Sequence, residues 1–385
     1  MVTGLYSPDI NGANLQCKLV SDTLVSKKIF NINILTGSLE NRCEKELIDN
    51  IQIFRFGINK KFNFINFFNL FNFIINAFIL VYKSNIVHIH GWSKRNLIIL
   101  LLCKILRIKT VFKITSFGID DPMSIKNTYF LNWLVFKNFD YYLGATPEMM
   151  KSALDSGIEV NKFVSIKNMV DTNKFRLFSE YEKLFFRNKY GYHSKDKIII
   201  SVGHFSKDKN HNLLIDSYFE LKKIYHHLKI IIIGSFNNIN YEVDKSIYDE
   251  IYKKFLNNND LINFNFINST DNIEEFYALS DIFVTSSKRE GLSNALLEAM
   301  SCGLGVISTN VNNLSTYLIE DKLNGLINYD MFQEKDLTNK ISIFLKNDKY
   351  RVFCGENANT FINSHYNLDS EIIKILQLYK NLIKY

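Results

Sequence analysis

Short apolar runs alternate along the chain with longer segments whose apolar residues recur every three or four positions. The short runs are rich in β-branched and aromatic residues, and polar or glycine-containing turns bound them. This pattern predicts buried strands that alternate with helices. The predicted strands are residues 30–36, 51–56, 86–90, 110–115, 141–145, 197–203, 228–234, 261–267, 281–285 and 304–309.

The alternation of strands and helices predicts an α/β fold whose parallel sheets are covered on both faces. The 385 residues suffice for two domains of ordinary size, and the strands fall into two series joined near residues 168–195. We therefore predict two Rossmann-like domains that face each other across a cleft. The first comprises residues 1–170, with a C-terminal helix at 366–385 packed back on it, and the second comprises residues 171–365.

One segment, residues 62–82 (FNFINFFNLFNFIINAFILVY), is long enough to span a bilayer, but asparagines interrupt it. Three interpretations stay open: a transmembrane span, an amphipathic helix packed on the core, which is the simplest of the three, and a helix on a membrane surface. Lys60, Lys61 and Lys83 flank the segment and suit the last of these. One helical face would carry Phe64, Phe67, Phe68, Phe71, Ile75 and Phe78, and the opposite half Asn63, Asn66, Asn69, Asn72 and Asn76.

Composition narrows the class of protein. Hydrophobic residues make up 47% of the chain and charged residues 22%, which is typical of a globular protein. The net charge of +7 fits an anionic small molecule, an anionic membrane face or nucleic acid, but no run of five like charges and no platform of aromatic and basic residues supports nucleic-acid binding. The five cysteines are widely spaced and predict buried thiols in a reducing compartment. The N-terminal residues lack the basic and apolar regions of a signal peptide, so we expect a cytoplasmic protein.

The first candidate site is the sequence REGLSNALLE at residues 289–298, which follows a predicted strand. Ser293 is a predicted N-cap, and the free N–H groups of the helix that follows would point to the strand ends, where open α/β sheets bind ligands. Glu290 precedes this helix and Glu298 lies on its second turn. Their carboxylates can accept hydrogen bonds from two parts of one extended ligand. Taken alone, however, such a pair is more typical of surface glutamates.

Two glycine-containing turns also follow predicted strands. The turn from Gly203 through His204 to Lys209 combines a glycine, a lysine and a helix N-terminus, which suits a diphosphate. Gly12, after a short first strand at the N-terminal sequence VTGLYSP, would allow a ligand to approach the backbone closely. Each turn by itself is more typical of an ordinary connection between a strand and a helix.

Taken together, these segments resemble the retaining glycosyltransferases of family four, which have the GT-B fold. The resemblance rests on the E-x7-E pattern in SSKREGLSNALLEAMSCG and covers most of the chain. It is strong in the second half, where order and spacing both agree, and weaker in the first. The other matching motifs are VGHFSKDKNHNLLIDSY (202–218), IKNMVDTNKF (166–175), NIEEFYALSDIFVTSS (272–287) and EDKLNGLI (320–327).

The resemblance implies a role for each matching residue. Glu298 would hold the ribose hydroxyls of a nucleotide, and Glu290 would contact the donor sugar. Lys209 would bind the diphosphate together with His204, which stands where the family usually has an arginine. Glu290, Lys209 and His204 are therefore the candidate catalytic residues. The donor-binding backbone would include Gly12, Gly203, Gly291, Leu292 and Ser293.

Some positions depart from the family's pattern, and they bear on the donor and on activity rather than on the fold. Asn312 and Asn313 replace the usual glycine pair, and Thr316 replaces the glutamate that commonly follows. Gly305 stands in place of a proline, and Ser116 stands where many relatives have a histidine that contacts the donor sugar.

Metal binding is not expected. Asp120 and Asp121 precede Pro122 and are predicted to cap a helix rather than to hold a metal. His88 and His90 alternate on a predicted strand and have no third ligand nearby in sequence, so we expect an interior or cleft-lining role. The resemblance implies a metal-independent enzyme without a cofactor, whose co-substrate is a nucleoside-diphosphate sugar.

The expected function is that of a retaining, hexosyltransferase-type glycosyltransferase. It would extend a cell-surface glycan (O-antigen, capsule or lipopolysaccharide) on a lipid-linked or oligosaccharide acceptor at the inner face of the cell membrane, with residues 62–82 as a candidate membrane contact. The alternative is a catalytically degenerate GT-B-like protein that binds a glycan or a partner. A nicotinamide-dependent oxidoreductase is disfavoured because no G-x-G-x-x-G motif follows a strand.

Overall fold

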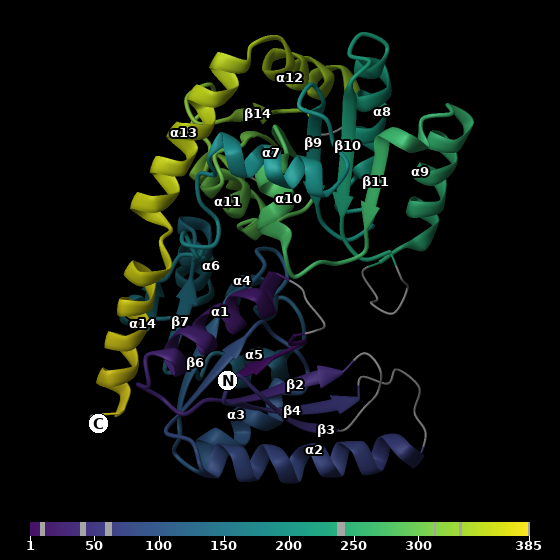
Figure 1. Cartoon of the computed structure of the whole chain (residues 1–385). Helices are drawn as coiled ribbons and strands as arrows, with labels where there is room; N and C mark the ends of the chain where they lie inside the picture. The colour runs from purple at the N-terminus through teal and green to yellow at the C-terminus, as the bar shows by residue number, and fades with distance from the viewer. Residues whose placement is uncertain are drawn as a thin grey trace. The chain divides into compact units, whose positions relative to one another are not determined.

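The computed structural model divides the chain into two compact units (Figure 1). The first unit comprises Met1–Met169 and Leu368–Tyr385, and the second comprises Val170–Asn367. The chain therefore enters the second unit once and returns to the first with its last helix. The structure describes residues 1–7, 12–38, 44–57, 64–236, 243–311, 313–330 and 333–383.

The first unit is built on an eight-stranded sheet in the order β3-β4-β2-β1-β5-β6-β7-β8. All neighbouring strands are parallel except β3, which pairs antiparallel with β4 at the edge. Asp49 and Asn50 join these two strands with positive φ angles of 51° and 65°, as a tight hairpin turn requires. The strands are Val2–Thr3 (β1), Asn33–Ser38 (β2), Glu44–Ile48 (β3), Ile51–Gly57 (β4), Ile86–His90 (β5), Lys109–Lys113 (β6), Tyr141–Gly144 (β7) and Phe163–Ser165 (β8).

Helices bury both faces of this sheet. Successive residues of a strand point to opposite faces, so Val111 packs with residues of α1 and α14, whereas Phe112 packs with residues of α2, α3, α5 and α6. Both side chains are fully buried, which explains why the strand reads as a continuous apolar run. The helices are Gly12–Ser26 (α1), Phe64–Tyr82 (α2), Asn96–Ile105 (α3), Pro122–Lys126 (α4), Phe130–Phe136 (α5), Pro147–Ser156 (α6) and Leu368–Ile383 (α14).

The second unit contains a six-stranded, fully parallel sheet in the order β11-β10-β9-β12-β13-β14. Its strands are Lys197–Val202 (β9), Leu228–Ile233 (β10), Phe264–Ile267 (β11), Ile282–Thr285 (β12), Gly305–Thr309 (β13) and Leu326–Asn328 (β14). Its helices are Glu180–Lys189 (α7), His211–Lys222 (α8), Lys245–Asn257 (α9), Ile273–Leu279 (α10), Asn294–Ser301 (α11), Glu334–Lys346 (α12) and Asp348–His365 (α13). A core of aliphatic strand residues packs with residues of α8, α9 and α12 on one face.

The predicted α/β class with two Rossmann-like units is confirmed, and a strand overlaps each of the ten predicted ranges. Sequence reasoning missed β3, β8 and β14. The last two are only three residues long, and β3 is an edge strand whose side chains are mostly exposed, so none of them carries a long apolar run. The first three residues of the predicted strand 261–267 instead form a short 3-10 helix.

The segment at 62–82 contains the helix α2, and only one face of this helix packs on the core. Phe73, Ala77 and Val81 are buried, whereas Phe71, Ile75 and Phe78, which we had placed on one predicted apolar face, are exposed. Of the three open interpretations, core packing is therefore wrong for these three exposed residues, although another face of the helix does pack on the core. Residues 58–63 and the side chains of 64–69, including Phe64, Phe67 and Phe68, lie outside the described residues. Within the described part of the chain, none of the helices is both long and apolar enough to cross a membrane.

Candidate functional site

The candidate site of the second unit lies at the carboxyl ends of β9 and β12, which are neighbours in its sheet. The turns that follow these two strands are joined by hydrogen bonds. Ser286 Oγ donates to Asn210 O over 2.9 Å, and Lys288 N donates to Asp208 O over 2.7 Å. Two segments about 80 residues apart in sequence thus form one rigid rim at the strand ends, because each turn fixes the backbone of the other.

The turn after β9 is shaped by close backbone packing. A Cβ atom on Gly234 would lie 2.0 Å from Gly203 O, so no side chain fits where these two backbones meet. The side chain of Lys209 lies over Gly203, since a Cβ atom there would be 3.1 Å from Lys209 Cδ. His211 Nε2 lies 3.1 Å from Gly203 O, and burial lowers the pKa of His211 to about 4. The imidazole is therefore neutral and donates from Nε2 to this carbonyl.

An ion pair joins the two turns at the centre of the rim. Lys209 Nζ lies 2.6 Å from Glu290 Oε1, and Ser287 Oγ donates to the same oxygen over 2.7 Å. The two charged side chains are only 20% and 17% exposed. A cation and a carboxylate thus meet at the strand ends, where the cation can bind an anion and the carboxylate can accept hydrogen bonds from hydroxyls.

The helix α11 begins directly after this ion pair. Ser293 is its N-cap, as predicted, and its Oγ accepts a hydrogen bond from Leu296 N. Gly291 and Leu292 form the approach to the helix, with Leu292 buried. The first N–H groups of a helix have no intrahelical partner and carry a partial positive charge, so this end of α11 suits a phosphate or a sugar hydroxyl.

Glu298 lies on the second turn of α11 and is only 8% exposed. Tyr277 OH, from α10, donates to Glu298 Oε2 over 3.0 Å and fixes the orientation of the carboxyl group. Burial raises the pKa of Glu298 to about 7, although the hydrogen bond from Tyr277 and the nearby Lys174 favour the charged form. The energetic cost of burying this carboxylate identifies Glu298 as a candidate functional residue, because hydroxyl donors of a ligand would stabilise its charge.

The structure thus brings together most of the residues predicted for the second unit. Lys209, Glu290 and Ser293 lie on the joined rim, and Glu298 follows on the same helix. His204 lies in the turn after β9 and is half-buried. Gly12 is the first residue of α1 in the first unit, but residues 8–11 before it lie outside the described residues.

Sequence reasoning missed two residues that hold the candidate carboxylates. Ser287 binds Glu290, and Tyr277 binds Glu298. Ser287 had a usable signal, because hydroxyl residues directly after a buried strand lie at the ligand-binding edge of the sheet. Tyr277 had none, since it is 21 residues from Glu298 in sequence and only packing brings the two together.

Three of the departures from the family's pattern lie near the two ends of β13. Asn313, which has a positive φ of 60°, precedes a short 3-10 helix, and Thr316 Oγ1 donates to Asn313 O. Gly305 opens β13, where a Cβ atom would lie 2.6 Å from a side-chain atom of Arg351. Asn312 lies outside the described residues.

Asp120 and Asp121 have structural roles. Asp121 caps α4, as predicted, and accepts from Ser124 N. Asp120 accepts hydrogen bonds from the backbone of Thr115 and Ser116. Over the residues that the structure describes, no group of three or more His, Cys, Asp and Glu side chains could hold a metal ion. Cys17, Cys103, Cys302 and Cys354 are buried free thiols, and Cys43 lies outside the described residues.

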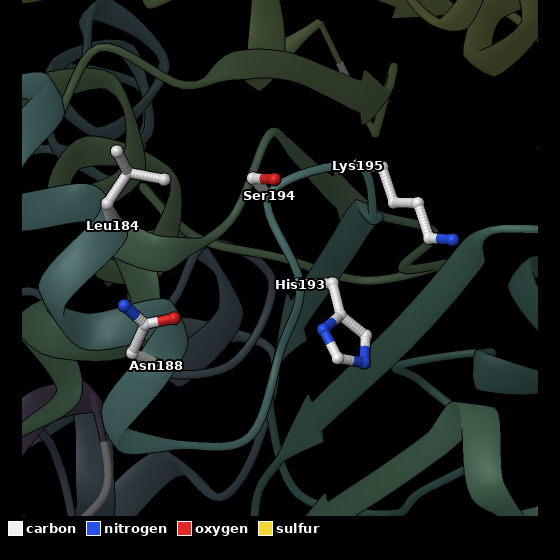
Figure 2. Close-up of a pocket in the computed structure, with 5 residues that line it drawn as sticks. All are labelled: Leu184, Asn188, His193, Ser194 and Lys195. Atoms are coloured by element: carbon white, nitrogen blue, oxygen red, sulfur yellow. The ribbon is translucent and has the colours of Figure 1, made fainter.

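A hollow of about 480 Å³ in the second unit lies away from the rim (Figure 2). Its lining residues come from the end of α7 and from the turn that leads into β9, so it lies at the amino end of that strand. All of them are exposed, and the hollow is therefore an open surface feature rather than the ligand site. These residues are Leu184, Asn188, His193, Ser194 and Lys195.

The architecture of the chain is similar to that of solved structures. The crystal structure of Anabaena HepE in complex with UDP and glucose is similar to the chain with a TM-score of 0.78, over 98% of both chains and at 14% sequence identity. The fold is GT-B. Within this GT-B chain, residues 182–361 match the family model of glycosyl transferases group 1. The matched range includes the residues of the rim in the second unit.

Two curated relatives share part of the GT-B chain. The Campylobacter jejuni protein named N-acetylgalactosamine-N,N'-diacetylbacillosaminyl-diphospho-undecaprenol 4-alpha-N-acetylgalactosaminyltransferase is 30% identical over 168 residues, 43% of this chain and 42% of the relative. The capsular polysaccharide biosynthesis glycosyltransferase CapM of Staphylococcus aureus is 26% identical over 232 residues, 60% of this chain and 54% of the relative. The chain thus spans about half the length of curated relatives that it matches.

Proposed function

We propose that the protein is a retaining glycosyltransferase that moves a sugar from a nucleoside-diphosphate sugar to a growing cell-surface glycan. The observation that carries this proposal is the joined rim. Lys209 and Glu290 form an ion pair beside the N-terminus of α11, and the buried Glu298 lies on the second turn of that helix. This order of groups matches the order of parts in a nucleotide sugar. The family match over residues 182–361 supports the same assignment.

The donor would lie along the first turns of α11. Glu298 would accept hydrogen bonds from the two ribose hydroxyls, which stabilise its charged form. The ammonium of Lys209, the backbone at Gly203 and the N-terminus of α11 would face the diphosphate, and Glu290 would accept from hydroxyls of the donor sugar. Lys209 and Glu290 now neutralise each other, so a bound diphosphate would take over the ammonium as its partner.

Catalysis in this proposal comes from positioning and from stabilising the departing diphosphate. Its negative charge grows as the bond to the anomeric carbon breaks, and Lys209, His204 and the positive end of α11 are the groups that would stabilise it. The carboxylate of Glu290 is held by both Lys209 and Ser287, and these contacts would restrain it as a nucleophile. We therefore propose front-face substitution with retention, without a metal ion.

The acceptor is proposed to be a lipid-linked or oligosaccharide glycan of the O-antigen, capsule or lipopolysaccharide type. The name of the C. jejuni relative specifies an undecaprenol-linked diphosphosugar, and that of CapM specifies capsule synthesis. Such an acceptor would place the enzyme at the inner face of the cell membrane. The proposal therefore includes peripheral membrane contact through the segment 62–82.

A panel of nucleotide sugars tests the proposal, with thermal stabilisation as the readout of binding and release of nucleoside diphosphate as the readout of turnover. We expect one donor to stabilise the protein and to be consumed, and Glu298→Ala to abolish that stabilisation. The control is Ile262→Ser, a change at an exposed position of the second unit outside the rim. Unchanged nucleotide affinity in Glu298→Ala would refute the assigned role, and a product of inverted anomeric configuration would refute retention. Binding without any release of diphosphate would instead support the alternative of a non-catalytic GT-B-like binding protein.

A further inference from the structure

Three neighbouring helices of the first unit, α2, α3 and α5, each bury one face and expose another. α3 contacts both α2 and α5, so the three helices form one row against the sheet. Their buried residues, such as Phe73, Leu100 and Phe136, belong to a common core on this face of the sheet. The opposite faces of the three helices point away from that core.

Large apolar side chains cover these outward faces. Phe130 is 74% exposed, Leu131 69% and Ile105 68%, values typical of a free surface rather than of a core edge. We call the whole set the three-helix apolar surface. It consists of Leu70, Phe71, Ile75, Phe78, Ile79 and Tyr82 from α2, Leu101 and Ile105 from α3, and Tyr129, Phe130, Leu131 and Leu134 from the start and length of α5.

The spacing of these residues shows that they form stripes rather than isolated exposures. Leu101 and Ile105 are four residues apart on α3, and Phe130 and Leu134 are four apart on α5, so each pair lies on one helical face. On α2, the residues from Phe71 to Tyr82 recur at intervals of three and four. Single exposed apolar residues are ordinary in soluble proteins. Apolar stripes on three adjacent helices instead indicate a surface that a membrane or another molecule covers.

The charge around this surface is strongly one-sided. Residues 64–140 contain nine lysines and arginines and three aspartates, a net charge of +6. Asp120 and Asp121 are buried and hydrogen-bonded within the unit, and so is Lys113. Asp140 pairs with Lys109, so the other basic residues make the surface of this stretch positive. The exposed basic residues next to the apolar stripes are Lys83, Lys94, Lys104, Arg107 and Lys137.

We propose that the three-helix apolar surface docks on a lipid bilayer that contains anionic lipids. The apolar side chains would enter the boundary between headgroups and acyl chains, and the basic residues would contact lipid phosphates. The occupant is a bilayer rather than a second copy of this chain. A two-fold dimer would place the same surface on both partners and bring one basic rim close to another, and Asp140 is already paired with Lys109.

The proposal extends the candidate membrane contact beyond α2. Sequence reasoning considered only residues 62–82, whereas α3 and α5 contribute half of the exposed residues named above. The proposed membrane surface is also separate from the candidate site for sugar transfer, because every residue of the surface belongs to the first unit and none belongs to that site. Membrane binding and donor binding can therefore fail independently.

Flotation with vesicles tests the proposal on the full-length protein. We expect the protein to float with vesicles of phosphatidylcholine that contain about a third phosphatidylglycerol, and to float much less with phosphatidylcholine alone or at high salt. Lys104→Glu/Arg107→Glu should lower the partition coefficient by at least about 25-fold, since each basic residue contributes a factor of about five through its attraction to anionic lipid. Phe130→Ser/Leu131→Ser should lower it by a similar factor while leaving thermal stability unchanged, because both side chains are exposed.

Matched controls lie in the second unit. Ile262→Ser removes a side chain that is 86% exposed, and Lys253→Glu/Lys349→Glu reverses two exposed charges. Neither control should change flotation. The proposal is wrong if the unaltered protein does not float with anionic vesicles, or if the controls weaken flotation as much as the test variants. It is also wrong if light scattering shows a dimer that Phe130→Ser/Leu131→Ser dissociates while vesicles bind neither form. Thermal stabilisation by nucleotide sugars, measured on the same proteins, reports separately on the proposed enzymatic function.

Discussion

The carboxyl group of Glu298 combines burial with a hydrogen bond from Tyr277, and burial raises its pKa to about 7. A fraction of the molecules therefore carries a neutral carboxyl group near neutral pH. Hydroxyl groups that donate to the carboxylate stabilise its charged form, so a bound ribose would lower this pKa. Binding of the proposed donor should then release a proton from Glu298.

We predict that the affinity for a nucleotide sugar rises with pH up to about 7 and is flat above it. Below about pH 7 the association constant should fall by up to about tenfold per pH unit, because Glu298 must first lose its proton. Titration calorimetry with a nucleotide sugar measures this, since the diphosphate diester does not titrate in the range. Glu298→Gln should bind weakly and without this slope. A wild-type affinity that does not vary with pH would contradict the prediction.

Residue-scale reasoning from sequence identified Glu290, Glu298, Lys209 and Ser293 but not their partners. The candidates were found because they belong to a continuous pattern of fixed spacing. Tyr277 and Ser287 act through side-chain contacts with residues of that pattern, and contacts of this kind are decided by packing. The pKa shift of Glu298 likewise depends on burial, which spacing alone does not supply.

At the scale of elements, the rim depends on the close contact between the turn after β9 and the end of β10. Gly234 follows β10, and its Cα faces the carbonyl of Gly203 at a separation that excludes a side chain. The backbone of the turn carries Lys209 to Glu290 and is joined to the turn after β12. A displacement at Gly203 would therefore be transmitted to the ion pair.

Gly234→Ala should destabilise the protein and impair the site. The added Cβ would lie 2.0 Å from Gly203 O, so the turn must shift, at a cost of about 2 kcal/mol in unfolding free energy. We also expect weaker binding of nucleotide sugar, measured by calorimetry below the unfolding temperature. The matched control is Gly4→Ala in the first unit, where no atom lies within 4 Å of the new Cβ. Equal stability of the two variants would show that the contact is not restrictive.

Elements with strong local patterns were predictable, and those without were not. The ten apolar strands and the capped helix α11 follow from residues close together in sequence. The edge strand β3 was missed because its residues Glu44–Ile48 are largely polar and exposed, and its pairing comes from the hairpin turn at Asp49 and Asn50. The position of the apolar stripe on α2 stayed open because periodicity shows that a helix has two faces but does not show which of them is buried.

At the scale of the whole molecule, the core of the first unit contains a pair of buried histidines. His88 and His90 are 2% and 3% exposed, and their rings lie 4.1 Å apart. His88 Nδ1 lies 2.5 Å from Tyr379 OH of α14, so the pair connects β5 with the returning C-terminal helix. Burial lowers the pKa of both residues, that of His90 to about 3. Repulsion from His90 lowers the pKa of His88 further, and the positive charges of Lys113 and of the N-terminal amine lower both pKa values.

The first unit should therefore lose stability in acid. Both histidines are neutral in the folded state and gain protons in the unfolded state below about pH 6.5, so the stabilisation is complete above that pH and is lost as the pH falls toward the folded-state values. For His90 alone the loss between about pH 7 and pH 4 would be about 3 kcal/mol. Chemical denaturation monitored across this range measures it. His90→Leu should show a smaller pH dependence, and an identical dependence in the variant would contradict the assignment.

The sequence by itself determined the α/β class, the two series of strands, the capped helix and the candidate carboxylates, because each of these depends on residues that are near neighbours in the chain. The tertiary structure alone decided which helix faces are buried, how Lys209 meets Glu290 from a segment about 80 residues away, and why Glu298 holds its proton near neutrality. It also brought three exposed stripes from α2, α3 and α5 to one side of the first sheet. These features depend on burial and on contacts between distant segments, which are properties of the packed molecule rather than of any local pattern.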